Sequence, residues 1–151
     1  MPIETLKEAK EHLRSNFEKG CKCPACGQFV KLYKRKFNTV MARSLISLYQ
    51  LGGGFHHVKE IIKGISDTGT NDFSKLKYYG FIAEEINVET QKRTSGNWKI
   101  TQTGIDFVLR NITVHSYVLL YNGKMQGFSG EQINIETALG NRFNYAELME
   151  Y

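Results

Sequence analysis

The sequence lacks any run of apolar residues near the roughly 20 that a membrane-spanning helix needs. Its first residues, Met1 to Glu4, also lack the charged and then apolar layout of a secretory signal. These two absences lead us to expect a cytoplasmic protein with no membrane partner. With 151 residues, of which 41% are hydrophobic and 23% charged, the chain has enough apolar material for a folded core.

The sequence also lacks the common signatures of nucleotide binding and catalysis. It has no P-loop and no dinucleotide fingerprint, and the triple glycine at 52–54 is not followed by the Lys and the Ser or Thr that phosphate binding requires. The carboxylates of Glu84, Glu85 and Asp106 are isolated and do not form a paired acid site. We therefore expect no enzymatic activity.

Cysteine is scarce, and all three cysteines lie between positions 21 and 26. An odd, clustered set in a reducing compartment is a poor disulfide framework and suggests a metal site. Residues 23–27 read CPACG, which matches the knuckle of zinc ribbons, because two thiolates separated by two residues can bind one tetrahedral ion. The match implies a structural zinc ion bound by Cys21, Cys23 and Cys26. The alternatives are a knuckle without metal and a free thiol at Cys21.

A zinc ribbon needs a second cysteine pair, which this sequence lacks, so the fourth ligand would be a histidine, a group from another chain, or nothing. The strand expected after the knuckle covers about 20 Å at the strand rise. The helix expected over 38–51 returns a similar distance. If the two run antiparallel, His57 comes back near the knuckle, with His56 as the second choice. Three sulfurs and one nitrogen would close the site and make it structural.

The hydrophobic pattern predicts an α+β chain in three parts. Residues 1–37 hold a helix over 3–18, the cysteine knuckle and a short strand over 29–33. Residues 38–112 hold helices over 38–51, 57–63 and 71–79, strands over 81–88 and 96–100, and a helix over 103–111. Residues 113–151 form an appendage with a hairpin of strands 114–121 and 124–128, joined by Asn-Gly, and two short helices.

The order of elements over 38–110 is that of a winged helix-turn-helix. Residues 73–82 (FSKLKYYGFI) look like the end of a recognition helix that runs into the first wing strand. Residues 98–107 (WKITQTGIDF) look like the second wing strand followed by the T-x-x-G start of the next helix. Both stretches resemble the MarR-like group, named after the multiple-antibiotic-resistance regulator. The resemblance implies a winged helix over 38–112 that binds DNA.

The implied DNA site lies on the third helix and on the wing loop, because a helix fits the major groove and its outward face meets base edges. Phe73 and Leu76 are expected to be buried in that helix. The side chains expected at bases are Asn71, Ser74, Lys75 and Tyr78. Those expected on the wing are Gln91, Lys92 and Arg93, and further phosphate contacts are expected from Lys34, Arg35, Lys36 and Arg43.

The formal net charge of +5 favours polyanionic partners. We therefore expect a sequence-guided duplex-DNA-binding protein that acts as a transcriptional regulator. A homodimer is expected because two-fold sites need two recognition helices, with the first helix and the C-terminal appendage as its surfaces. The alternative is a protein-interaction module that binds and modulates a host protein, such as a defence or anti-defence factor, because winged helices also bind proteins.

The whole arrangement of knuckle, winged helix, hairpin and tail resembles small proteins of unassigned role that phages and prophages encode. This resemblance implies a phage context, and therefore a bacterial host cytoplasm, but no particular activity.

Overall fold

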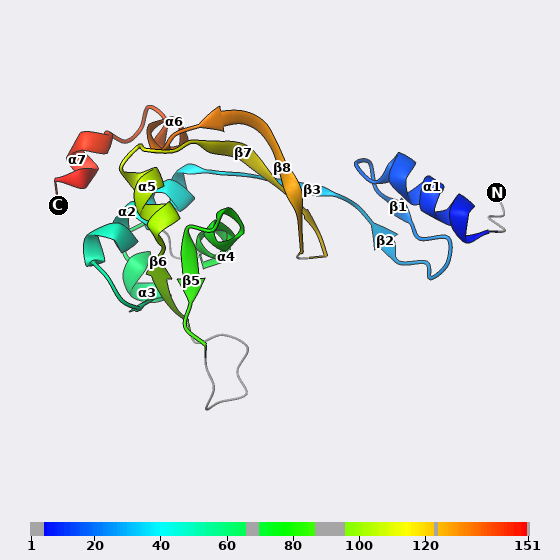
Figure 1. Ribbon diagram of the computed structural model, residues 1–151, viewed down its shortest axis with the longest axis horizontal. Coiled ribbons are helices and arrows are strands. Elements are labelled where there is room, and N and C mark those ends of the chain that lie inside the picture. The colour runs from blue at the N-terminus through cyan, green and yellow to red at the C-terminus, as the bar shows by residue number, and fades with distance from the viewer. Residues whose placement is uncertain (1–4, 66–69, 87–95, 123, 151) are drawn as a thin grey trace. The chain divides into compact units, whose positions relative to one another are not determined.

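The computed structural model describes residues 5–65, 70–86, 96–122 and 124–150, and it is α+β as the sequence predicts (Figure 1). The helices are α1 (Leu6–Asn16), α2 (Thr39–Leu51), α3 (Val58–Ile61), α4 (Thr70–Ser74), the 3₁₀ helix η1 (Lys75–Tyr79), α5 (Gln102–Val108), α6 (Ile135–Leu139) and α7 (Tyr145–Met149). The strands are β1 (Cys21–Lys22), β2 (Phe29–Val30), β3 (Tyr33–Lys36), β4 (His56–His57), β5 (Ile82–Glu84), β6 (Asn97–Ile100), β7 (Val114–Tyr121) and β8 (Lys124–Ile133). In these described ranges, no helix is both long and apolar enough to cross a bilayer.

The chain divides into two compact units. Unit 1 comprises Met1–Lys36 and Tyr117–Ser129, and unit 2 comprises Phe37–Ser116 and Gly130–Tyr151. The sequence pattern suggests three consecutive parts, whereas each unit is built from two segments that lie far apart in the chain. The reason is the pairing of β3 with β7, which no local pattern can reveal.

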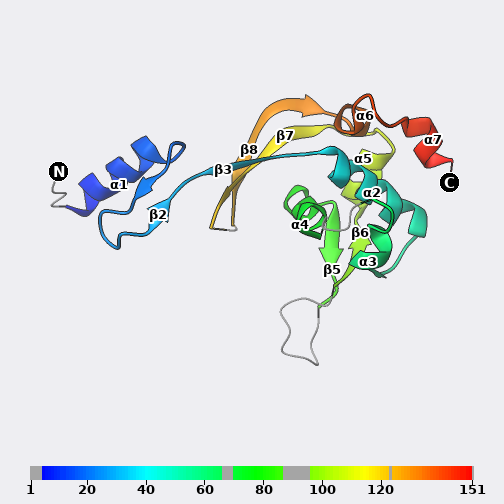
Figure 2. The same cartoon turned by 180° about the vertical axis from the view of Figure 1, so that it is seen from behind.

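Unit 1 begins with helix α1, which lies alongside the β1–β2 hairpin (Figure 1 and Figure 2). The Thr5 hydroxyl caps the helix by accepting the Glu8 amide hydrogen at 3.1 Å. Just after the helix, the ring of Phe17 packs edge-on against Tyr121 of β7, with ring centroids 5.3 Å apart. This contact joins the N-terminal helix to a strand from the last third of the chain.

The larger sheet has the order β3-β7-β8, so β3 is an edge strand. It runs antiparallel to β7, with Tyr33 opposite Leu120 and Lys36 opposite Tyr117. All four β3 side chains are exposed, whereas β7 alternates and buries Val118. The sequence predicts a strand over 29–33, but the structure breaks it into β2 and β3 and extends β3 through the basic run. Long-range pairing with β7 overrides the local pattern there.

Helix α2 forms the centre of unit 2, where it contacts α3, α4, α5, α6 and β6. It begins after Asn38, whose side-chain oxygen accepts the Met41 amide hydrogen at 2.9 Å. Its apolar stripe is fully buried, with Leu45 and Leu48 at 0% exposure. The predicted helix over 38–51 therefore forms as expected and supplies one wall of the core.

An aromatic cluster around Phe37 completes the core of unit 2. The ring centroid of Phe37 lies 5.2 Å from Tyr79, 6.1 Å from Phe81 and 5.3 Å from Phe107. Phe81 and Phe107 are stacked at 4.7 Å. Burial raises the pKa of the Tyr79 phenol to about 12, so the cluster stays uncharged at neutral pH. The cluster therefore joins the start of α2 to η1, β5 and α5.

The smaller sheet of unit 2 has the strand order β4-β6-β5, and both pairings are antiparallel. His56 lies opposite Trp98, and Ile82 lies opposite Ile100. The predicted helix over 57–63 is shorter in the structure, because His57 keeps an extended backbone, pairs with β6 and caps α3. In chain order, unit 2 therefore runs α2, β4, α3, α4-η1, β5, β6 and α5.

The T-x-x-G stretch has a direct structural role at the start of α5. The Thr101 hydroxyl accepts the Gly104 amide hydrogen at 3.1 Å and donates to the carbonyl of Gly80 at 2.5 Å. The Thr101 amide donates to the Phe81 carbonyl at 2.9 Å. Helix α5 is thereby held so close to the chain before β5 that a Cβ at Gly104 would overlap the Phe81 carbonyl oxygen.

Replacing Gly104 by alanine is expected to lower the free energy of unfolding by about 1–3 kcal/mol, because the added methyl group meets rigid backbone. Urea denaturation followed by the fluorescence of Trp98, the single tryptophan, measures the change. Gly53→Ala is the matched control, because a Cβ there meets no atom within 4 Å. Equal stability of the two variants would contradict this account of the motif.

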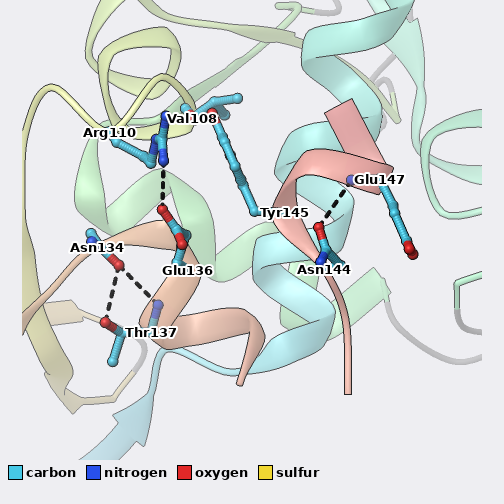
Figure 3. Close-up of polar contacts among 8 residues, drawn as sticks. All are labelled: Val108, Arg110, Asn134, Glu136, Thr137, Asn144, Tyr145 and Glu147. Atoms are coloured by element: carbon cyan, nitrogen blue, oxygen red, sulfur yellow. Dashed lines mark hydrogen bonds and ion pairs between the residues drawn. The ribbon is translucent and has the colours of Figure 1, made fainter. Parts of the chain in front are cut away.

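The C-terminal segment of unit 2 is anchored to the end of α5 (Figure 3). Arg110 adopts a left-handed backbone with φ 65°, a conformation that usually favours glycine at a helix end. Its guanidinium bonds Glu136 of α6 at 2.8 Å and lies 4.6 Å from the ring centroid of Tyr145 of α7. The Tyr145 hydroxyl in turn donates to the Val108 carbonyl at 2.6 Å. Both terminal helices are thus tied to α5.

Each of the two terminal helices begins with an asparagine cap. Asn144 accepts the amide hydrogen of Glu147 at 3.2 Å, which is the spacing expected for a capped start. Asn134 caps α6 in the same way through Thr137, at 2.9 Å (Figure 3).

Candidate nucleic-acid interface and cysteine knuckle

Helix α4 and the 3₁₀ helix η1 form the segment that the sequence predicts as a DNA-reading helix. Phe73 and Leu76 are fully buried, as predicted, and Phe73 packs edge-on against Trp98 of β6 at 5.7 Å between ring centroids. Ser74, Lys75 and Tyr78 are partly exposed. The side chain of Asn71 lies outside the described residues.

The second half of this segment differs from the predicted α-helix in a way that changes its outer face. Phe73, Leu76 and Tyr79 are buried at a spacing of three, which is the period of a 3₁₀ helix. Lys77 is therefore exposed, with its Nζ 5.3 Å from the Tyr78 ring centroid. An α-helical period does not predict that Lys77 is exposed, whereas the spacing of three between the apolar residues does.

Lys75 is less available than Lys77. Its side chain is only 21% exposed, and its Nζ lies 3.9 Å from a carboxylate oxygen of Asp72 in the preceding turn. An anion that approaches this helix therefore meets Lys77 before it meets Lys75.

The predicted wing residues Gln91, Lys92 and Arg93 lie outside the described residues. Strands β5 and β6, which flank that loop, are well defined: Glu84 pairs with Trp98, and Glu85 bonds the Asn97 carbonyl through its amide at 2.9 Å. The two ends of the wing loop are therefore attached to a pair of hydrogen-bonded strands in unit 2.

The predicted phosphate contacts fall in both units. Arg43 lies on α2 in unit 2, with its guanidinium carbon 4.2 Å from the ring centroid of Phe143, so it also holds the C-terminal segment. Lys34, Arg35 and Lys36 form most of β3 in unit 1, and all three are exposed.

The cysteine knuckle is the turn of the β1–β2 hairpin, in which Cys21 pairs with Val30. The Cys23 amide donates to the Gln28 carbonyl at 2.7 Å, and the Gly27 amide donates to the Cys23 carbonyl at 2.9 Å. Gly27 has φ 75°, which suits a glycine at this tight turn. The turn is thus closed by two backbone hydrogen bonds of one residue, which fix the backbone of Cys23.

The surroundings of Cys23 stabilise a negative charge on its sulfur. Hydrogen bonds from the backbone amides of Cys26 and Ala25, together with one from the Cys26 side chain, lower the pKa of the Cys23 thiol. A thiolate that accepts two amide hydrogens beside a second thiol is the arrangement that a metal-binding knuckle provides. The same arrangement also favours thiol chemistry.

The two histidines that the sequence offers as a fourth ligand belong to unit 2. His57 belongs to unit 2, where its Nδ1 accepts the Lys59 amide hydrogen at 3.1 Å and its ring lies against Gly96. His56, the second choice, has its Nε2 3.3 Å from the Gly52 carbonyl oxygen. Within the described part of the chain, no three His, Cys, Asp or Glu side chains gather into a metal cluster.

No protein-family model, no curated protein and no solved structure matches this chain significantly.

Proposed function

We propose that this chain binds duplex DNA and that unit 2 is a winged helix domain of MarR-like arrangement. The order of elements from α2 to β6 is the observation that supports this. A short strand precedes the second helix, a reading helix leads directly into a two-stranded wing, and the sheet order β4-β6-β5 places the first short strand beside the second wing strand. The T-x-x-G contact between α5 and Phe81 holds this arrangement together.

In this proposal the α4-η1 helix enters the major groove. Lys77 is the most accessible positive charge that this helix presents to DNA. Ser74 and Tyr78 supply hydroxyl groups for base edges or phosphates. Asn71, Lys75 and the wing residues Gln91, Lys92 and Arg93 complete the interface. The protein acts as a transcriptional regulator, and a homodimer presents two such helices to a two-fold site.

An electrophoretic mobility shift with the full chain tests this function. The protein is expected to shift a random duplex at 50 mM salt and to lose most of that binding at 200 mM, because phosphate contacts release counterions. Lys77→Ala and Arg93→Ala are each expected to reduce the slope of log affinity against log salt by about one. Arg142→Ala, an exposed change between α6 and α7, is the control and is expected to keep the full slope.

Failure of the wild-type chain to shift any duplex at low salt would overturn the DNA-binding function. The remaining function for unit 2 would then be the binding of a host protein. Unchanged binding by both Lys77→Ala and Arg93→Ala would mean that DNA contacts a different surface.

We also propose a structural zinc ion at the knuckle, supported by the charge-stabilised sulfur of Cys23 and its neighbour Cys26. These two residues fit a zinc knuckle, with Cys21 and His57 as the further predicted ligands. Bound zinc would hold both thiols as thiolates and tie the two ends of the hairpin turn together. Its role is in folding and not in catalysis.

A further inference from the structure

The positive charge of the chain is concentrated in unit 1. Unit 1 contains ten Lys and Arg against four Asp and Glu, a net charge of +6, whereas unit 2 contains ten against eleven, a net charge of −1. The total of +5 therefore comes entirely from the unit that lacks the winged helix. Because sequence-independent affinity for DNA follows positive charge, the segment that reads bases and the segment that attracts DNA need not be the same.

Strand β3 is the densest part of this positive charge. Lys34, Arg35 and Lys36 follow one another on an edge strand, and all three side chains are exposed. No described carboxylate forms an ion pair with any of the three. Side chains on one face of a strand are two residues, or about 6.8 Å, apart, which equals two axial rises per phosphate on one DNA strand. An extended edge strand of cations can therefore follow a phosphate backbone.

The aromatic residue of β3 favours phosphate contact over base stacking. Tyr33 carries two cations over its ring, with Lys31 Nζ at 5.4 Å and the Arg35 guanidinium carbon at 5.6 Å from the ring centroid. A base that stacked on this ring would have to compete with these two cations. They also hold Lys31 and Arg35 on one side of the strand, while Lys34 and Lys36 alternate to the other.

We propose that β3 of unit 1 is the main anchor on the phosphate backbone of DNA and supplies most of its salt-dependent, sequence-independent affinity. This inference rests on the proposed DNA-binding function. It assigns base reading to unit 2 and attraction to the polyanion to unit 1. The basic run alone predicts Lys34, Arg35 and Lys36 as additional phosphate contacts, and the charge distribution makes them the principal ones.

The test compares three variants of the full chain on a random duplex across a range of salt. In the neutral variant, Lys34, Arg35 and Lys36 are all replaced by Gln, and the slope of log affinity against log salt is expected to fall by about 2.7. In the charge-preserving variant (Lys34→Arg, Arg35→Lys and Lys36→Arg) the slope is expected to stay at the wild-type value. The matched control replaces the exposed Lys59, Lys63 and Arg142 of unit 2 by Gln and is expected to lose less than about one unit of slope.

The outcomes separate this inference from the proposed function. Wild-type binding with equal slope losses in the neutral variant and the unit 2 control would overturn the β3 anchor and leave DNA binding in place. Absence of wild-type binding would overturn the DNA function. Elution from a heparin column then tests the anchor by itself: earlier elution of the neutral variant than of the unit 2 control supports it, and equal elution overturns it.

Discussion

Replacing Phe37 by alanine is expected to lower the free energy of unfolding of unit 2 by about 3–5 kcal/mol. Phe37 is 1% exposed and touches the rings of Tyr79, Phe81 and Phe107, so the change leaves a cavity where four elements meet. A loss of this size is a large share of the roughly 5–15 kcal/mol that keeps a domain folded. Urea denaturation followed by the fluorescence of Trp98 measures it.

Phe55→Ala is the matched control for this prediction, because it removes the same ring from a residue that is 41% exposed. Its cost is expected to stay below about 1 kcal/mol. A Phe37 variant that unfolds at the same urea concentration as the Phe55 variant would show that the aromatic cluster does not stabilise unit 2.

Replacing Cys23 by serine is expected to remove the zinc ion proposed at the knuckle, from about one equivalent per chain to almost none. The serine hydroxyl is a poor zinc ligand, and the amide hydrogen bonds that stabilise the Cys23 thiolate would have no sulfur to act on. A structural zinc site can contribute on the order of 10 kcal/mol to folding, so the β1–β2 hairpin is expected to lose its order as well. Metal analysis of the purified protein measures the first effect and amide hydrogen exchange measures the second.

Ala25→Ser is the control, because it changes an exposed side chain in the same turn and keeps the backbone amide that bonds Cys23. It is expected to retain full zinc content. Full zinc content in the Cys23→Ser protein would refute the knuckle as the metal site. Cys21→Ser and His57→Ala, measured in parallel, show which of these residues completes the coordination.

Features that depend on a few neighbouring residues could be predicted from the sequence. Asn38 caps the central helix, Asn144 caps the last one, and Phe73 and Leu76 are buried as their spacing indicates. Strands β7 and β8 are neighbours in one sheet, as the expected hairpin requires. In each case the physical cause lies within a few residues, in a cap, a turn or an apolar stripe.

Features that depend on distant residues could not be predicted in this way. The edge strand β3 forms because β7 pairs with it. The two-residue strand β4 forms because it pairs with β6. Local periodicity contains no information on either pairing, since tertiary packing decides it. The exposure of Lys77 is an intermediate case, because the spacing of three between Leu76 and Tyr79 is visible in the sequence but only packing shows that it tightens the end of the helix.

The pairing of β3 with β7 also has a consequence for how the chain is made. Tyr33 and Leu120 are more than 80 residues apart, so during synthesis β3 emerges long before its partner strand. A bare strand edge invites pairing with other chains, and consecutive lysines and arginines discourage it by mutual repulsion. Lys34, Arg35 and Lys36 are therefore expected to disfavour such pairing in the nascent chain and at the edge of the described sheet, where β3 has β7 as its neighbour on one side.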